Sequence, residues 1–474
     1  MSSLSVPRMP VSKGSIGVGI DFGTTNSVAA IFDGKTTSLV PLEAGQPILP
    51  SALYIDKSYT TTVGQKAIER YVSSNTGRKV ELVPEVIGET AEFAGSMGGG
   101  FEPVDTVKTK MYGASVIDSG LEGRLFRGTK RLLGDSSIHR LMVFEQAFRL
   151  VALITPLLLD IRKSIEKFSP TVDFGYLGRP VNFEGKEKHR NELAISRLSD
   201  AFKFAGIKKQ TFYPEPIAAA ISYLQGKQDL AGESLLSFDF GGGTLDLCVL
   251  RRTQGSFQVV ATHGVALGGD HIDQRIFRCL LFPLLGKGER WKRRGMDRQI
   301  DTPFPFSDYE ELLVNWPISY TLNQNRYTAP IMDCISQGHV QSQKFERLRD
   351  LIQQNLGYVI FQEIKNFKAQ LSNSAYAELD IPEIDVLVQL TRAEFEELIG
   401  DFLEQIERAL DDVLEKANLK MAEVDLVLRT GGSSLIPAVN QILKDRFPGR
   451  VVDHDPFTSV AKGLAIASYR SNTA

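Results

Sequence analysis

The sequence of 474 residues contains only three cysteines, Cys248, Cys279 and Cys334, which lie far apart and form no Cys-x-x-Cys pair. Their scarcity argues against a disulfide framework or a zinc site. We therefore expect buried free thiols in a reducing compartment, and a cytoplasmic protein. The net charge of −3 provides no basic surface, so we expect no nucleic acid partner.

Long apolar runs are also missing. The longest, Val151 to Leu159, is too short to cross a bilayer and contains Pro156, so we predict a buried helix and no membrane span. Residues 1–15 mix Ser, Pro, Lys and Arg without an apolar core, which is typical of a disordered tail rather than a signal peptide. With 42% hydrophobic and 23% charged residues, the composition is that of a soluble globular protein, and the length indicates at least two domains.

The common nucleotide-binding motifs do not occur. A Walker motif at Gly34-Lys35-Thr36 requires glycine at position 29, which is Ala29, and the dinucleotide pattern beginning at Gly17 fails at Phe22. Asp21-Phe22-Gly23 also occurs in protein kinases, but the kinase His-Arg-Asp loop is missing.

The most informative pattern occurs twice, at Gly19–Ser27 and at Ser237–Asp246. In each copy an apolar run leads into an aspartate, Asp21 or Asp239, followed by small and hydroxylated residues and a second apolar run. We expect a strand, a tight turn and a returning strand, with backbone N–H groups and hydroxyls facing an anion. The aspartate is placed to meet a hydrated Mg²⁺ on the same phosphates. One such turn is typical of an ordinary hairpin, but two that face each other would clamp a nucleotide.

Other segments have ordinary interpretations when taken singly. Lys130-Arg131 is typical of a solvated surface, and Glu215 of a charge at a helix start. Thr391 and Glu394 form a capping box that predicts one long amphipathic helix to Val413. We expect residues 63–134 to be irregular, with a flexible excursion at Gly98–Gly100, and 284–341 to hold a basic cluster, 290–294, that is either solvated or a partner surface.

In combination and in order, the segments resemble the nucleotide-binding domain of the DnaK-type heat-shock chaperones, within the actin, sugar-kinase and heat-shock ATPase superfamily. The short YegD-like branch, which lacks a peptide-binding domain, is the most similar type. This resemblance implies an α/β fold of two actin-like, ribonuclease H-like lobes with an interlobe nucleotide cleft. Lobe I would span residues 16–233 with an inserted subdomain at about 56–143, and lobe II residues 234–474 with one at about 268–385. The resemblance rests on Gly19–Ser27, Thr129–Gly134, Gly178–Phe183, Glu215–Ala220, Phe238–Asp246, Leu267–Asp273, Leu390–Leu398 and Thr430–Pro437.

The resemblance also implies ATP or ADP and Mg²⁺ as ligands. Asp21 and Asp239 would hold the metal through water, Lys130 matches the family's catalytic lysine, and Glu215 matches the carboxylate near the attacking water. Pro180 matches a proline that couples the lobes. The remaining implied cofactor-binding residues are Gly23, Thr24, Thr25, Asn26, Gly241, Gly242, Gly243, Thr244, Gly268, Gly269, Lys368, Gly431, Gly432 and Ser433.

This sequence departs from the family around the nucleoside. Ala369 and Leu435 stand where the family has two adenine-flanking arginines, and Lys365 replaces a glutamate, whereas Lys368 is retained. Loss of each guanidinium removes stacking of about 0.5–2 kcal/mol, which leaves base selectivity open. Nothing after Ser468 resembles the family's linker or peptide-binding domain, so we expect chaperone-like action to need a protein partner or co-chaperone.

Three functions follow from the resemblance. The leading one is a Mg²⁺-dependent heat-shock-type ATPase whose lobes close around the nucleotide. The second is a nucleotide-gated binding or filament-forming module with little hydrolysis, and the third a small-molecule kinase of the sugar-kinase kind.

Overall fold

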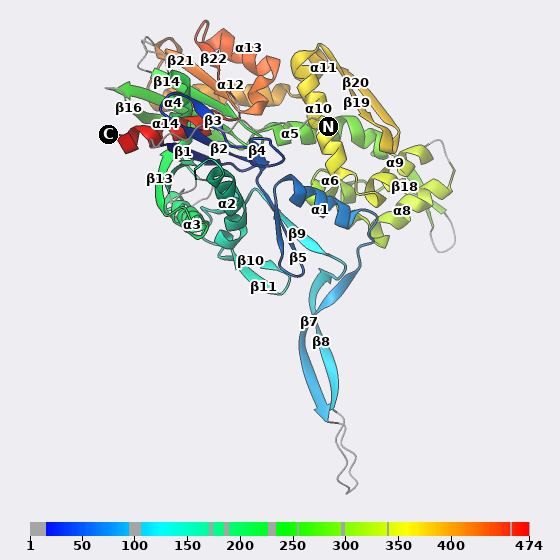
Figure 1. Cartoon of the computed structure of the whole chain (residues 1–474). Helices are drawn as coiled ribbons and strands as arrows, with labels where there is room; N and C mark the ends of the chain where they lie inside the picture. The colour runs from blue at the N-terminus through cyan, green and yellow to red at the C-terminus, as the bar shows by residue number, and fades with distance from the viewer. Residues whose placement is uncertain are drawn as a thin grey trace, which may run out of the picture.

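The computed structural model describes residues 16–93, 106–169, 174–183, 189–225, 234–253, 256–294, 299–338, 341–455 and 457–473. The tail predicted at 1–15 and the excursion predicted at Gly98–Gly100 lie outside these residues. The described residues form two large mixed sheets with helices on their faces (Figure 1). The strands of each sheet come from segments that lie far apart in the sequence. The residue limits predicted for the lobes and their inserted subdomains remain predictions.

The first sheet has the strand order β13-β12-β1-β2-β3, with β4 also paired to β2. Strand β1 pairs antiparallel with β2 and parallel with β12, so the ends of β1, with Asp21, and of β12 lie at the same edge of the sheet. Helices α2 and α3 share an apolar core with β1. The elements are β1 (Gly17–Phe22), β2 (Asn26–Phe32), β3 (Thr37–Leu39), β4 (Ile48–Pro50), α2 (Leu150–Glu166), β12 (Phe174–Arg179), α3 (Arg190–Phe204) and β13 (Lys209–Pro214).

The second sheet repeats this arrangement in the order β16-β15-β14-β21-β22. Strand β14 pairs antiparallel with β15 and parallel with β21, as β1 does with β2 and β12. Asp239 in β14 thus takes the position that Asp21 takes in β1. The elements are β14 (Ser234–Phe240), β15 (Leu245–Thr253), β16 (Ser256–Val265), α12 (Gly400–Ala417), β21 (Leu426–Thr430), α13 (Pro437–Arg446) and β22 (Val451–Asp453).

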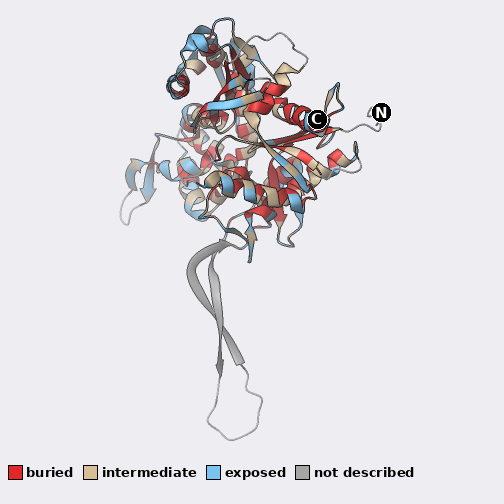
Figure 2. Ribbon diagram, turned by 90° about the vertical axis from the view of Figure 1, so that its left-hand side faces the viewer, coloured by how far each residue is buried: buried red, intermediate tan, exposed pale blue. Residues whose placement is uncertain are grey.

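Helices α4 (Glu215–Leu224) and α14 (Ser459–Thr473) join the two lobes. One apolar cluster contains residues of both helices and of both sheets, and Figure 2 shows buried residues in the interior of the molecule. The contacts are close because glycines remove side chains from them. A Cβ at Gly19 would lie 2.3 Å from the carbonyl oxygen of Ala461, and one at Gly463 would lie 1.7 Å from that of Ala218. The two sheets are therefore held at a fixed, tight junction.

The stretch predicted to be irregular, residues 63–134, contains regular structure. Strands β7 and β8 form an antiparallel pair that extends away from the rest of the molecule (Figure 1). Its sequence alternation is broken at Pro84 and Gly88, near the shifts in pairing register, which explains why periodicity gave no signal. The elements of this part are β5 (Ala52–Asp56), β6 (Thr61–Val63), α1 (Gln65–Asn75), β7 (Leu82–Phe93), β8 (Thr106–Asp118), β9 (Gly123–Arg127), η1 (Thr129–Leu132), β10 (Arg140–Val143) and β11 (Gln146–Arg149).

The second inserted part is largely helical, including most of the stretch at 284–341 that the sequence left unassigned. Stacked aromatic side chains such as Phe304, Phe306 and Tyr309 fill its core. Its elements are α5 (Gly269–Ile276), η2 (Phe277–Leu281), η3 (Phe282–Leu285), β17 (Arg290–Arg294), β18 (Gln299–Pro303), α6 (Ser307–Leu313), α7 (Trp316–Ser319), η4 (Tyr320–Leu322), α8 (Asn325–Ser336), α9 (Ser342–Gln353), α10 (Gly357–Asn373), β19 (Tyr376–Ile381), η5 (Pro382–Ile384), β20 (Val386–Thr391) and α11 (Arg392–Leu398).

The predictions for the helix after Thr391 and for the cysteines are each correct only in part. The capping box at Thr391 is confirmed, since Glu394 N–H donates to Thr391 Oγ1 and Thr391 N–H to Glu394 Oε2. The helix it starts is not continuous, however, because α11 ends at Leu398 and α12 begins at Gly400.

All three cysteines are free, but Cys279 is exposed, so only two thiols are buried as predicted. No helix in the described ranges is long and apolar enough to cross a membrane.

We predict that Gly463→Ala lowers the thermal unfolding midpoint, because the new methyl group must displace α14 from α4. Overpacking of this kind costs roughly 1–3 kcal/mol. Gly400→Ala is the matched control, since a Cβ there meets nothing within 4 Å. Equal unfolding midpoints for the two variants would show that the helix junction tolerates a side chain.

Candidate functional site

The two aspartate-bearing turns face a shared cavity of about 250 Å³ between the lobes. The β1–β2 turn comes from one side, the β14–β15 turn from the other, and η1 and the start of α4 complete the wall. Most of the residues predicted from the sequence are therefore brought together. Those that line the cavity are Asp21, Gly23, Thr24, Thr25, Asn26, Lys130, Glu215, Asp239, Gly241, Gly242, Gly243, Thr244, Gly431 and Gly432.

The carboxyl groups at the ends of the two sheets are held in an unfavourable environment. Burial, followed by the neighbouring Glu215 carboxylate, raises the pKa of Asp21 to about 7, against the opposing effect of Lys130. Burial, followed by the carboxylates of Asp246 and Glu215, raises the pKa of Asp239 to about 7. Both groups consequently favour a nearby positive charge.

Lys130 supplies one such charge within the site. It lies in η1, which starts after Gly128, and its Nζ donates a 2.7 Å hydrogen bond to Glu215 Oε1. Burial lowers the pKa of Lys130, but the carboxylates of Glu215 and Asp21 outweigh it and the net shift is upward. The surface interpretation of this lysine is therefore wrong, because its side chain is only 7% exposed.

The glycine turn of β14 and β15 is fixed from behind. Gly269 N–H and Ser433 Oγ both donate to the carbonyl oxygen of Gly241, at 3.0 and 2.9 Å, and Asp270 N–H donates to that of Gly242 at 2.7 Å. The turn's carbonyls thus point toward α5, while Gly242 and Gly243 line the cavity. A turn held in this way is prepared to present N–H groups to an anion.

Four predicted residues, Gly268, Gly269, Lys368 and Ser433, do not line this cavity. Gly268 packs on the turn so closely that a Cβ would lie 2.3 Å from the Gly242 carbonyl oxygen. Lys368 Nζ lies 2.5 Å from the buried carboxylate of Asp273 and donates to the Gly269 carbonyl at 3.1 Å. In this structure the four residues support the turn, and their direct contact with a nucleotide stays a prediction.

Three further residues of the site were not selected from the sequence: Arg131, Asn182 and Asp246. The guanidinium of Arg131 packs against Gly243, where a Cβ would lie 1.4 Å from Nη2. Asn182 Nδ2 donates to Thr262 Oγ1 at 3.2 Å across the lobes, and Thr244 Oγ1 donates to Asp246 Oδ2 at 2.7 Å. All three stand inside the recognised motifs, but the contacts of Arg131 and Asn182 across the lobes depend on tertiary structure.

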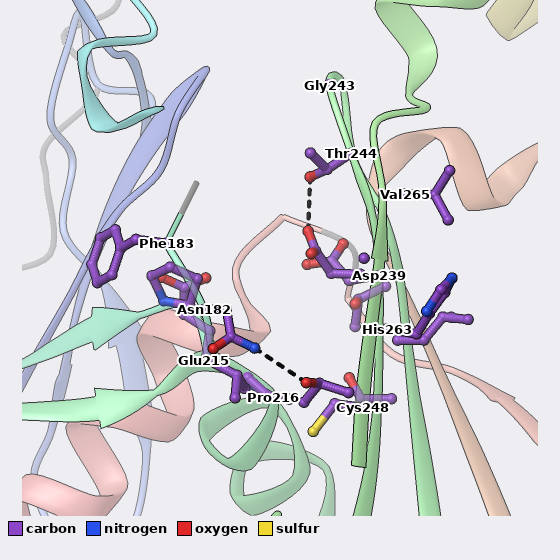
Figure 3. A pocket seen from close by; sticks show the side chains of 18 of the residues that line it. Asn182, Phe183, Glu215, Pro216, Asp239, Gly243, Thr244, Cys248, His263 and Val265 are labelled. Atoms are coloured by element: carbon purple, nitrogen blue, oxygen red, sulfur yellow. Dashed lines mark hydrogen bonds between the residues drawn. The ribbon is translucent and has the colours of Figure 1, made fainter. Parts of the chain in front are cut away.

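A second cavity of about 360 Å³ adjoins the first, between the Pro180–Phe183 loop and strands β15 and β16. Figure 3 shows Asn182, Phe183 and Glu215 on one side and Asp239 and Thr244 on the other. Pro180, the residue matched to lobe coupling, lines both cavities. A change at the phosphate side can thus reach the loop directly.

Another set of contacts joins the lobes beyond the glycine turns. Tyr71 Oη donates to the carbonyl oxygen of Pro317, and Asn323 Nδ2 donates to that of Arg78 at 2.9 Å. Val80 N–H in turn donates to the Asn323 carbonyl at 3.0 Å. We call this set of contacts, between residues 71–80 and 316–323, the clasp. It ties an inserted part of one lobe to that of the other.

The donor set fits a hydrated cation better than a metal held by protein alone. Asp21, Glu215, Asp239 and Asp246 bring four carboxyl groups to the cavities, whereas Lys130 and Arg131 bring two cations. In the described ranges, however, no three His, Cys, Asp or Glu side chains are close enough to bind one ion directly. Water and ligand oxygens would have to complete the coordination of Mg²⁺.

Comparison with known proteins bears on this geometry. The Hsp70 protein family model matches residues 17–96, 191–287 and 338–469, which together make up more than half of the chain. The chain belongs to the Hsp70 family. The match confirms the predicted fold class of two actin-like lobes, and Hsp70 membership implies ATP or ADP as the nucleotide.

A similar relative is the chaperone protein dnaK of Cyanidioschyzon merolae, at 27% identity over 464 residues. The alignment covers 95% of this chain and 61% of the chaperone, so this Hsp70 chain spans less than two thirds of that relative's length. Residues 288–337, which include one side of the clasp, lie outside the family match. The clasp therefore belongs in part to a segment that the family model does not match.

We predict that the ligand-free, metal-free protein becomes less stable as the pH rises from about 4 to 7. A folded-state pKa of about 7 for Asp21 and Asp239 lies above the usual value near 3.9, so the folded protein holds protons that the unfolded chain releases. Asp21→Asn removes one such group and is expected to raise the free energy of unfolding at pH 8 by roughly 1–4 kcal/mol.

Urea unfolding in a chelator at pH 5 and pH 8 measures this effect. Asp200→Asn, at an exposed position on α3, serves as the control and should leave the pH dependence unchanged. If the native and Asp21→Asn proteins lose stability in parallel over this pH range, Asp21 does not carry the raised pKa.

Proposed function

We propose that this Hsp70-family chain is a Mg²⁺-dependent ATPase that slowly converts ATP to ADP and phosphate and transmits lobe closure to a protein partner. The observation that carries the proposal is the buried Lys130–Glu215 pair, 2.7 Å apart, in a cavity flanked by two equivalent aspartate turns. An ion pair with a purely structural role needs no glycine turns beside it. A site for a charged phosphate chain needs such turns, because their N–H groups bind the phosphate oxygens.

Each residue has a distinct proposed role. The turns that contain Thr24, Thr25 and Gly242 bind the β- and γ-phosphates from opposite lobes through N–H groups and hydroxyls. Asp21 and Asp239 would hold Mg²⁺ through water, and the ion would neutralise charge on the phosphates. Their pKa values near 7 mean that both ionise readily when a cation is present.

Hydrolysis would proceed by direct attack of water on the γ-phosphorus. The water oxygen forms the new P–O bond, the bond to the bridging oxygen of ADP breaks, and the water's protons pass to phosphate and solvent. Glu215 accepts a hydrogen bond from this water and orients it, while Lys130 stabilises charge on the γ-phosphoryl oxygens. A donor of this kind contributes roughly 3–4 kcal/mol.

Lobe closure is the proposed output. Asn182–Thr262 and Arg131–Gly243 are contacts between the lobes next to the phosphate turns, so they depend on how the lobes sit around a ligand. We further propose a cytoplasmic protein of the short YegD-like type, which acts through a protein partner or co-chaperone.

The clasp favours a second possibility, an ATP-binding switch with little hydrolysis. Contacts that tie the inserted parts together oppose separation of the lobes, and turnover is limited if product leaves slowly. ATP-dependent sedimentation would reveal filament formation, the most distinctive form of such a module.

Lys130→Ala tests the proposed chemistry. We expect ATP turnover with Mg²⁺ to fall at least about 100-fold, because the charge on the γ-phosphoryl group loses its partner. Stabilisation by ATP, measured as the rise in unfolding midpoint above that of the ligand-free variant, should persist, since it reports binding. Lys203→Ala, which removes an exposed lysine on α3, is the control. Unchanged turnover in Lys130→Ala would refute the role of this lysine.

The clasp predicts slow release of bound nucleotide. Asn323→Ala removes the hydrogen bond to the Arg78 carbonyl, a loss of about 1 kcal/mol, so release should accelerate roughly fivefold. Stopped-flow displacement of fluorescent ADP measures the rate. Asn366→Ala, on the exposed face of α10, should release ADP at the native rate. Identical rates for both variants would mean that the clasp does not limit release.

A further inference from the structure

An unexpected aromatic side chain borders the phosphate cavity. Phe457, two residues before α14, is 47% exposed and lines the same cavity as Asp21, Lys130 and Gly242. Whereas Phe447, ten residues earlier, is fully buried, about half of Phe457 is open to solvent. Its flat, apolar face is instead available to a ligand in the cavity.

The ring lies against a section of backbone without side chains. A Cβ at Gly432 would lie 3.0 Å from Cζ of Phe457. At Gly431, φ is +81° and a Cβ would lie 2.4 Å from the Phe240 carbonyl oxygen, so this position requires glycine. Because neither glycine has a side chain, nothing at these two positions separates the ring from the open cavity.

The backbone that carries the ring is fixed by Asp455. Its Oδ1 accepts hydrogen bonds from the N–H groups of Phe457 and Thr458, at 3.2 and 3.1 Å, and its Oδ2 accepts from Lys462 Nζ at 2.9 Å. Although burial acts in the opposite direction, the hydrogen bonds from Thr458 and Lys462 hold the pKa of Asp455 at about 2. The carboxylate is therefore ionised at neutral pH and the turn is in place before any ligand binds.

We infer that Phe457 is a stacking platform for the nucleobase of the bound nucleotide. The inference rests on the proposed nucleotide binding and adds the residue that holds the base. Aromatic rings stack on bases through their π-faces, and a phenyl ring offers neither a donor nor an acceptor. Phe457 thus contributes affinity without selecting among purines, in a chain that has Ala369 and Leu435 at the positions of the family's two arginines.

Calorimetric titration of Phe457→Ala with MgADP and with inorganic tripolyphosphate tests this role. We expect binding of MgADP to weaken about tenfold, because removal of one stacked aromatic has an effect of this size. Tripolyphosphate has no base, so its affinity should not change. Phe457→Trp should keep the affinity for MgADP, and its indole fluorescence should change on addition of MgADP but not of tripolyphosphate.

Phe204→Ala is the matched control, since it removes another exposed phenyl ring, on α3 and outside both cavities. Native affinity for MgADP in Phe457→Ala, or equal weakening of both ligands, would overturn the stacking role and leave the proposed ATPase intact. Failure of the native protein to bind either MgADP or tripolyphosphate would overturn both.

Discussion

The structure depends on the cost of concentrating negative charge where two sheets end. Asp21 and Asp239 lie at equivalent strand ends, with Glu215 and Asp246 near them, and burial makes the ionised forms of Asp21 and Asp239 expensive. Lys130 is a buried positive charge beside them. This arrangement is poor for stability and well suited to binding a cation, because the charge of the ion offsets the repulsion between the carboxylates. The tight glycine junction of α4 and α14 holds the two halves in this unfavourable proximity.

The parts that sequence alone predicts are those encoded by short, local patterns. An apolar strand that ends in an aspartate and a glycine turn needs only its own residues to form that turn. Two copies of the pattern therefore predict two equivalent hairpins. The capping box at Thr391 is local in the same sense, and it formed as predicted. Lys130 needed the family resemblance as well, since on spacing alone a Lys-Arg pair is typical of a surface, and its burial comes from contact with Glu215, 85 positions away.

The parts that sequence did not predict depend on contacts between distant segments. Gly268, Gly269 and Ser433 carry the composition of an anion site, yet the structure uses them to brace the Gly241–Gly243 turn. The break between α11 and α12 interrupts an apolar stripe that is continuous in the sequence. The clasp joins residues some 250 positions apart and involves a segment outside the family match. None of these features has a periodic signal, because each is decided by what packs opposite.

The clasp and the two glycine turns act on the same two lobes. If a nucleotide bridges both turns as proposed, it would favour a closed cleft, and the clasp would add contacts to that state from a separate place. Because closure is stabilised from two separate places, loss of the γ-phosphate alone need not open the lobes. A partner that breaks the clasp would then supply differential binding energy that nucleotide chemistry does not. The segment at 288–337 would then place opening of the lobes under the control of a protein that contacts it, and the proposed chemistry would stay with the motif residues.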